Sequence, residues 1–232
     1  MSQSSAQTTS FPNADPDPKR FSPVPRRYRA VGSVIVLTLS LVLFLWYIGV
    51  FGGNVRTVVP GRVYRSAEIT GDTLARVLEQ DHIKTVINLR GGSPSDSWYQ
   101  SELAETARYG ARHLDVALSA THYPPPDRLQ TLMSDFDRAD YPVLFHCRGG
   151  ADRSGLAATL YLNVYQHVPL DQAEERGLTW RYAHFSFGQA HAMNDFFNLY
   201  RKTARGQTLR DWITKSYPDL YAHLPASLQT KP

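Results

Sequence analysis

The sequence of 232 residues contains one cysteine, Cys147. A disulfide within one copy of the chain is therefore excluded, because a bridge needs a second thiol. Cys147 must be a packing residue, a chance surface thiol or a nucleophile. The sequence also lacks an internal repeat, and its hydrophobic content of 42% suffices for one sizeable core but hardly for two large ones.

The excess of positive over negative charge is also small. The formal net charge is +4, and most of this excess lies within residues 1–29. The remainder of the chain is nearly neutral, so it does not predict the basic stripe that marks a nucleic-acid-binding face. We therefore expect no nucleic acid among the partners of this protein.

Residues 1–30 are rich in Ser, Pro and Gln and show no apolar periodicity, which predicts a disordered N-terminal tail. No charged residue lies between Arg29 and Arg56. A bilayer core requires about 20 apolar residues, so this stretch predicts one transmembrane helix over residues 31–51. A cleaved secretory signal is the alternative, although its apolar region is normally about 7–15 residues long.

The orientation of this helix follows from its flanking charges. Basic residues are clustered before the apolar stretch and sparser after it. Positive charge tends to stay in the cytoplasm, so we expect a single-pass membrane protein whose main domain lies on the periplasmic or outer side.

After the apolar stretch, short β-branched runs alternate with segments of helical periodicity. Strands are expected in "GRVYRSA", "KTVINLR", "RHLDVALS" and "YPVLFHC". The last of these is apolar almost throughout, which is typical of a central strand buried on both faces. The alternation predicts an α/β fold, with a central, mostly parallel sheet flanked by helices in one domain over residues 58–220, preceded by the transmembrane helix.

The segment "HCRGGADRSG", residues 146–155, connects the expected central strand to the next helix. Gly149 and Gly150 allow the backbone to turn tightly there. The free N–H groups at the start of the helix then form an anion site, where the pKa of the Cys147 thiol is expected to fall. The planar guanidinium of Arg153 can hold two oxygens of a bound anion at once.

This loop resembles the His-Cys-(x)5-Arg-Ser/Thr signature of the cysteine-dependent phosphatases, the protein-tyrosine and dual-specificity superfamily, at His146, Cys147, Gly150, Arg153 and Ser154. The stretches "GRVYRSAEIT", "KTVINLRGG" and "HLDVALSA" are also similar, in this order, to a bacterial subgroup of these enzymes. The resemblance covers most of the chain after residue 58. It implies a single phosphatase domain in a membrane-anchored member of the superfamily.

The resemblance further implies a phosphomonoester hydrolase that acts through a phosphocysteine on Cys147. Arg153 and the loop N–H groups would hold the phosphate, Ser154 would hydrogen-bond the thiolate, and His146 would orient the loop. The phosphate-binding segment would comprise Arg148, Gly149, Gly150, Ala151, Asp152 and Arg153. Arginine and backbone amides supply the positive field in such a site, so neither a metal nor a cofactor is expected.

Two aspartates are candidates for the general acid that protonates the leaving oxygen. Asp115, in "HLDVALSA", precedes Cys147 by an interval similar to that of the acid in dual-specificity phosphatases. Asp152 lies inside the loop itself, as an aspartate does in myotubularin-like lipid phosphatases. Asp127 is more typical of a helix start, where a carboxylate is favoured. We favour Asp115, with Asp152 as the alternative.

The expected substrates are phosphorylated proteins of the tyrosine or dual-specificity type. Related enzymes with nearly the same loop act on phosphoinositides and other phospholipids, so a phospholipid partner is the alternative. A rhodanese-type sulfurtransferase and a phospho-binding pseudophosphatase are more remote: the first typically has a shorter loop, and the second has usually lost its Cys or Arg.

One further residue near the loop allows two interpretations. Arg90, which ends "INLR", either points toward the site or forms a structural salt bridge.

A possible metal site is also suggested by the sequence. His184 and His191 lie close in sequence to Asp195, but their spacing fits no compact zinc pattern.

Overall fold

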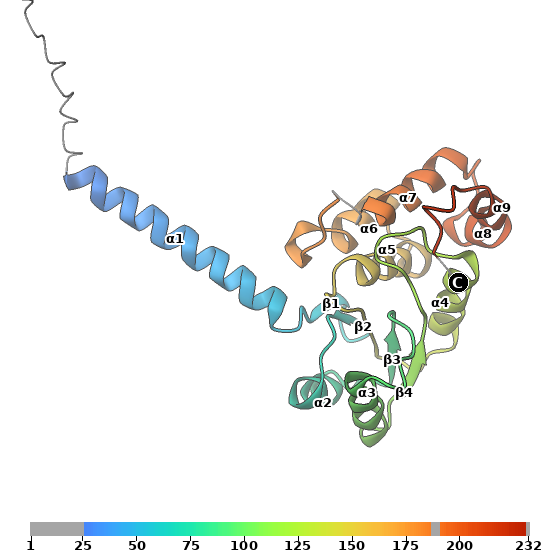
Figure 1. Cartoon of the computed structure of the whole chain (residues 1–232), viewed down its shortest axis with the longest axis horizontal. Coiled ribbons are helices and arrows are strands. Elements are labelled where there is room, and N and C mark those ends of the chain that lie inside the picture. Colours follow the sequence, from blue (N-terminus) through green and yellow to red (C-terminus); the bar gives the residue numbers. More distant parts are fainter. Residues whose placement is uncertain (1–25, 187–190, 231–232) are drawn as a thin grey trace, which may run out of the picture. The chain divides into compact units, whose positions relative to one another are not determined.

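The computed structural model describes residues 26–186 and 191–230 (Figure 1). The chain forms two compact units, Met1–Val42 and Leu43–Pro232, and the second of them holds the sheet. Most of the predicted disordered tail, residues 1–30, lies outside the described residues. Its last part, residues 26–30, is helical, since this stretch contains neither glycine nor proline and continues directly into the apolar run.

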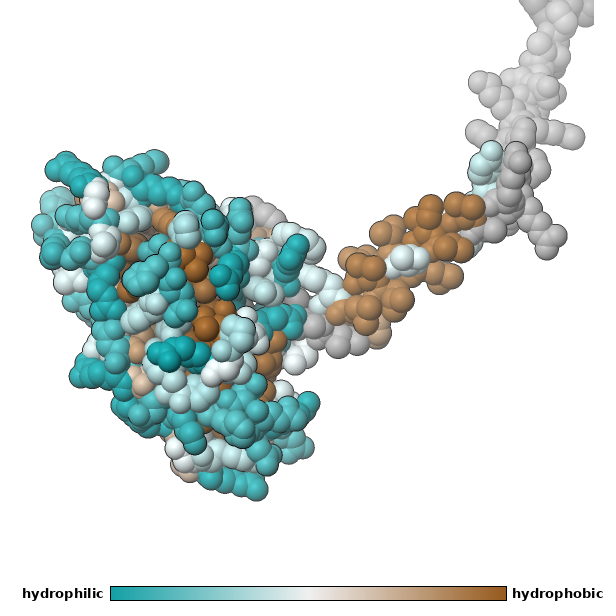
Figure 2. All heavy atoms as spheres, turned by 180° about the vertical axis from the view of Figure 1, so that it is seen from behind, coloured by the Kyte–Doolittle hydropathy of each residue, from teal (hydrophilic) through white to brown (hydrophobic). Residues whose placement is uncertain are grey.

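Helix α1 (Arg26–Phe51) contains the apolar stretch. Its described side chains from Val31 to Leu45 are exposed, and Figure 2 shows apolar residues over the face of this helix that is turned to the viewer. Across the described residues, however, the structure has no helix that combines the length and the apolar character needed to cross a membrane.

The transmembrane helix expected over residues 31–51 is therefore not supported, and the description of the chain as membrane-anchored is corrected accordingly. The location of the main domain on the outer side of a membrane depended on this helix and stays a prediction.

Five strands form one sheet. They are β1 (Arg56–Val59), β2 (Val63–Ser66), β3 (Thr85–Asn88), β4 (Arg112–Asp115) and β5 (Val143–His146), in the order β1-β2-β5-β3-β4. The last four run parallel, and β1 pairs with β2 antiparallel. The predicted α/β fold with a mostly parallel sheet is confirmed, with "YPVLFHC" in the central strand. Only the short edge strand β1 was not predicted.

The sheet lies between two groups of helices (Figure 1). One face is covered by α2 (Gly71–Gln80) and α3 (Ser97–Arg108). The other carries the helices that follow β4 along the chain, which are α4 (Pro126–Arg138), α5 (Asp152–Gln166), α6 (Leu170–Gly177), the short 3-10 helix η1 (Trp180–Tyr182), α7 (Ala192–Thr203), α8 (Leu209–Lys215) and α9 (Tyr217–Ala222). Alternate residues of β5 serve the two faces: Leu144 packs with the α2 side, and Phe145 packs with the larger core on the other side.

Helix α5 runs through the centre of the larger layer, and its residues from Ser154 to Leu162 are all buried. A Cβ atom on Gly155 would lie 2.8 Å from the carbonyl oxygen of Gly177, so only glycine permits this close packing of α5 against α6. The packing fixes the N-terminus of α5 beside the carboxyl end of β5. Ligands of parallel sheets bind at this edge.

Candidate active site

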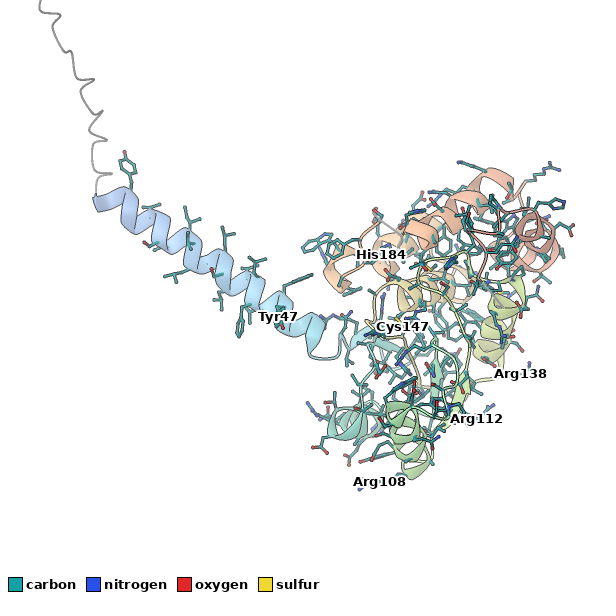
Figure 3. All side chains as sticks on the ribbon, viewed as in Figure 1. Tyr47, Arg108, Arg112, Arg138, Cys147 and His184 are labelled. Atoms are coloured by element: carbon teal, nitrogen blue, oxygen red, sulfur yellow. The ribbon has the colours of Figure 1, made fainter. Side chains whose placement is uncertain are left out.

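The loop between β5 and α5 lies at the carboxyl edge of the sheet, with Cys147 directly after the strand (Figure 3). Gly150 has a φ of +65°, which favours glycine. A Cβ atom at this position would lie 2.6 Å from the backbone nitrogen of Ala67 and 2.7 Å from the carbonyl carbon of Ser66. The loop can therefore rest against the end of β2 only because residue 150 has no side chain.

Cys147 is only 2% exposed. Burial alone would raise the pKa of its thiol, but the charge of Arg153, the Ser154 hydroxyl and the backbone N–H groups of Ser154 and Gly149 together lower it below its usual value. These groups come from the loop and the first turn of α5. Cys147, Arg153 and Ser154 thus lie together at a helix N-terminus, and their catalytic roles stay predictions.

A pocket of about 830 Å³ opens in front of the loop. The loop contributes Arg148, Gly149, Asp152 and Arg153 to its wall, and the opposite wall comes from segments around Gly53 and from residues 67–73. Several of the predicted phosphate-binding residues therefore face one cavity. Ala151 and Gly150 form the part of the loop that is buried behind it.

Arg90 forms a salt bridge with Glu68, and its guanidinium lies 3.8 Å above the ring of Trp98. Burial lowers the pKa of Arg90, and the neighbouring charges of Arg153 and Arg148 lower it further. Three arginines thus lie close enough to influence one another beside the pocket. The structural salt bridge that was one interpretation of Arg90 is present, and the residue also adds to this positive field.

Asp152, at the start of α5, lies at the pocket wall with its Oδ1 atom 2.7 Å from Nδ1 of His184. The Nε2 atom of His184 lies 2.9 Å from Oδ1 of Asn194. His184 therefore contacts the residue that begins α5, whereas Nδ1 of His191 lies 2.5 Å from Oδ2 of Asp195. The metal site suggested by their spacing does not form among the described residues, because the two histidines bind different carboxylates.

Asp115 ends β4, the edge strand, and β3 separates it from β5. Its Oδ1 atom accepts a hydrogen bond from Nδ2 of Asn88 at 2.8 Å, and its Oδ2 atom accepts one from the Tyr99 hydroxyl at 2.5 Å. The side chain is 30% exposed but is not among the residues that line the pocket. Both carboxylate oxygens are thus engaged by the scaffold, two strands away from the nucleophile.

His146 contacts a buried carboxylate that sequence analysis did not identify. Its Nε2 atom lies 2.9 Å from Oε1 of Glu102 in α3, and Nε2 of His113 lies 2.6 Å from the same oxygen. Burial would raise the pKa of Glu102, but hydrogen bonds and charge interactions with the two imidazoles bring it down to about 2. No local pattern marks Glu102, which is 44 residues from His146.

Several solved structures are similar to this chain. The DUF442 protein from Shewanella putrefaciens CN-32 is 16% identical, with 68% of this chain and 95% of that chain covered and a TM-score of 0.50. The core catalytic domain of the PP-IP phosphatase SIW14 from S. cerevisiae is 18% identical over 65% of this chain and 93% of that chain (TM-score 0.45). TpbA from P. aeruginosa is 23% identical over 66% and 86% (TM-score 0.45). No curated protein matches significantly in sequence.

The fold and the cysteine loop define a cysteine-dependent phosphatase of the protein-tyrosine and dual-specificity superfamily. The family model described as "Swiss Army Knife protein, DSP-PTPase phosphatase domain" matches residues 53–195. The chain therefore belongs to this family, PTP-SAK. The matched range includes the loop as well as His184 and Asn194.

The buried Glu102 makes stability dependent on pH in a defined window. Its pKa lies at about 2 in the fold and at 4.5 ordinarily, so the stabilisation is complete above pH 4.5 and is lost as the pH falls toward 2. We expect wild type to lose roughly 3 kcal/mol more than Glu102→Gln across this window. Urea unfolding between pH 2 and 6 measures this difference, and equal slopes in the two proteins would contradict the assignment.

Proposed function

We propose that this protein hydrolyses phosphomonoesters through a phosphocysteine on Cys147, and that its substrates are of the protein-tyrosine or dual-specificity type. One observation carries the proposal: a thiol with a lowered pKa lies at the N-terminus of α5, beside a pocket lined by Gly149 and Arg153. Free helix N–H groups and an arginine at one point are suited to bind the oxygens of a phosphate.

In the first step, the Cys147 thiolate attacks phosphorus, the bond between phosphorus and the ester oxygen breaks, and this oxygen takes a proton from the general acid. Arg153 and the loop N–H groups hold the three equatorial oxygens. In the second step, a water attacks the phosphocysteine and returns a proton to the acid residue. The Ser154 hydroxyl, which lowers the pKa of the Cys147 thiol, stabilises the thiolate that departs as phosphate is released.

We propose Asp152 as the general acid, in preference to Asp115. A general acid must come within hydrogen-bond reach of the leaving oxygen. Asp152 lies at the pocket wall next to Arg153, and only one of its oxygens is occupied by His184. Asp115 has neither property, because it does not line the pocket and both of its oxygens accept hydrogen bonds.

A phosphoinositide or another phospholipid remains the second candidate substrate, and the position of Arg148 favours it. One phosphate group is served by Arg153 and the loop, whereas Arg148 adds a further cation to the same pocket. A second cation is of use to a substrate that carries another anionic group.

A substrate panel separates these two candidates. We expect phosphotyrosine peptides to be turned over with the highest kcat/KM, and Arg148→Gln to leave this value within about threefold, since a solvated rim charge contributes little. Phosphoinositides and phosphatidylglycerol phosphate complete the panel. Higher kcat/KM on a lipid phosphate, with a loss of tenfold or more in Arg148→Gln, would replace the first candidate by the second.

The mechanism predicts different defects for the nucleophile and the arginine. Cys147→Ser should lose turnover by at least about a thousandfold but keep binding of vanadate, since the hydroxyl preserves the loop and is not ionised. Arg153→Lys should be severely impaired as well, because an ammonium cannot make the bidentate contact. Arg138→Lys, on the exposed side of α4, is the control. Turnover near the wild-type rate in either active-site variant would exclude the mechanism.

The two aspartates are distinguished by the leaving group. A p-nitrophenolate needs little protonation, whereas an alkoxide needs a great deal, so loss of the acid should slow hydrolysis of an alkyl phosphate far more. We expect Asp152→Asn to reduce the ratio of alkyl to p-nitrophenyl rates at least about a hundredfold. Asp115→Asn is the matched control and should leave the ratio unchanged. The opposite pattern would assign the acid to Asp115.

A further inference from the structure

A fully buried arginine lies at the rear of the phosphate loop. Arg65, on β2, is 1% exposed, and β2 is the strand next to β5. Its Nη1 atom donates a hydrogen bond to the carbonyl of Gly177 at 2.6 Å, and its Nη2 atom donates to those of Gly150 at 2.8 Å and Ala151 at 2.9 Å. These contacts join β2 to α6 and to the loop through one guanidinium group.

A charged side chain as deeply buried as that of Arg65 is unusual. Charged side chains in an interior are normally paired with an opposite charge. Among the residues that the structure describes, no salt bridge to Arg65 is formed, and its partners are carbonyl oxygens and the ring of Tyr182, whose centroid lies 5.0 Å from the guanidinium. Burial lowers the pKa of Arg65 to about 10, while the neighbouring Cys147 and Asp152 favour its charged form. Two of the three carbonyl oxygens that Arg65 binds belong to the loop, so its charge acts there.

A second buried side chain, Asn54, shares the carbonyl of Gly150 with Arg65. The Nδ2 atom of Asn54 lies 3.2 Å from the carbonyl oxygens of both Gly149 and Gly150. Together, Asn54 and Arg65 hold the carbonyls of three successive loop residues, 149 to 151, on the rear side of the loop.

The direction of these carbonyls determines the direction of the N–H groups. In a planar trans peptide, the C=O of one residue and the N–H of the next point to opposite sides. With the carbonyls of residues 149 to 151 held at the rear, the N–H groups of Gly150, Ala151 and Asp152 point away from Arg65. They point toward the side on which Gly149 and Arg153 line the pocket.

We propose that Arg65 is a positioning residue that, with Asn54, holds the loop carbonyls at the rear and so directs the loop N–H groups toward the phosphate oxygens of the substrate. The proposal rests on the proposed function and assigns Arg65 a role distinct from that of Arg153. Arg153 lies in the pocket wall and can touch the substrate, whereas Arg65 is sealed behind the loop and acts through it.

The charge of Arg65 adds a second effect. Its attraction to Cys147 favours the thiolate, in addition to the contributions of Arg153, Ser154 and the N–H of Gly149. Removal of this cation should therefore raise the pKa of the Cys147 thiol. A residue with a purely structural role, such as a link between β2 and α6, would not shift this titration in a folded variant.

The experiment compares Arg65→Met, Arg65→Lys and wild type by two measurements that need no identified substrate. The first is the affinity for vanadate and inorganic phosphate. The second is the rate of Cys147 alkylation by iodoacetamide between pH 5 and 9. Arg62→Met is the matched control, because Arg62 precedes β2 and contacts Tyr161 and Tyr141 rather than the loop. Circular dichroism and thermal melting establish that each variant is folded.

We expect Arg65→Met to bind vanadate at least about tenfold more weakly and to shift the alkylation midpoint upward by about one pH unit. Arg65→Lys keeps the charge but not the planar set of donors, so it should weaken vanadate binding with a smaller shift of the midpoint. Arg62→Met should match wild type in both measurements. Wild-type affinity and an unshifted midpoint in folded Arg65→Met would overturn the proposal.

Asn54→Gly decides the question if the Arg65 variants fail to fold. Asn54 has a φ of 45°, which glycine adopts without strain, so this change removes the amide and its hydrogen bonds to the loop carbonyls and to the carbonyl of Tyr182 without straining the backbone. It should weaken vanadate binding and leave the alkylation midpoint unchanged, and unaltered binding would overturn the proposal. Failure of the proposed function is distinguishable: wild type would then lack phosphatase turnover, whatever the Arg65 and Asn54 variants do to oxyanion binding.

Discussion

Keeping a reactive sulfur in the interior is the constraint on which the rest of the site depends. Burial raises the pKa of the Cys147 thiol, and positive groups have to reverse this effect before the sulfur can act as a nucleophile. Arg153 and the first turn of α5 do so from the pocket side, and Arg65 contributes from the rear. These groups come from β2, the loop and α5, so three elements must meet at one point. The central place of β5 in the sheet makes this meeting possible.

A second set of polar contacts stabilises the same edge of the sheet. Glu102 joins α3 to β4 through His113 and to the end of β5 through His146. Tyr99, also on α3, and Asn88, at the end of β3, hold Asp115 in place. The carboxyl ends of three neighbouring strands are thus connected by side-chain hydrogen bonds, which keeps the loop after β5 on a rigid base.

The features predicted from sequence are those with a local cause. The apolar run "YPVLFHC" indicates the central strand, and the glycines, cysteine and arginine of the loop lie within one short segment. Glu102, His184 and Arg65 could not be assigned in this way, because their contacts to the loop depend on how distant elements pack. The sequence favours Asp115 as the acid because of its interval to Cys147, and this assignment stays a prediction. The hydrogen bonds of Asp115 to Asn88 and Tyr99 follow from the fold and could not be read from the interval.

The contact between Asp152, His184 and Asn194 has a consequence for the direction of proton transfer. An amide oxygen can only accept, so Nε2 of His184 donates to Oδ1 of Asn194, which fixes the orientation of the imidazole ring. The other ring nitrogen, Nδ1, lies 2.7 Å from Oδ1 of Asp152 and so fixes the rotation of this carboxyl group. With Oδ1 turned to His184, Oδ2 is the oxygen left to face a leaving group. Under the proposed role of Asp152, a proton would therefore leave and return through one defined atom.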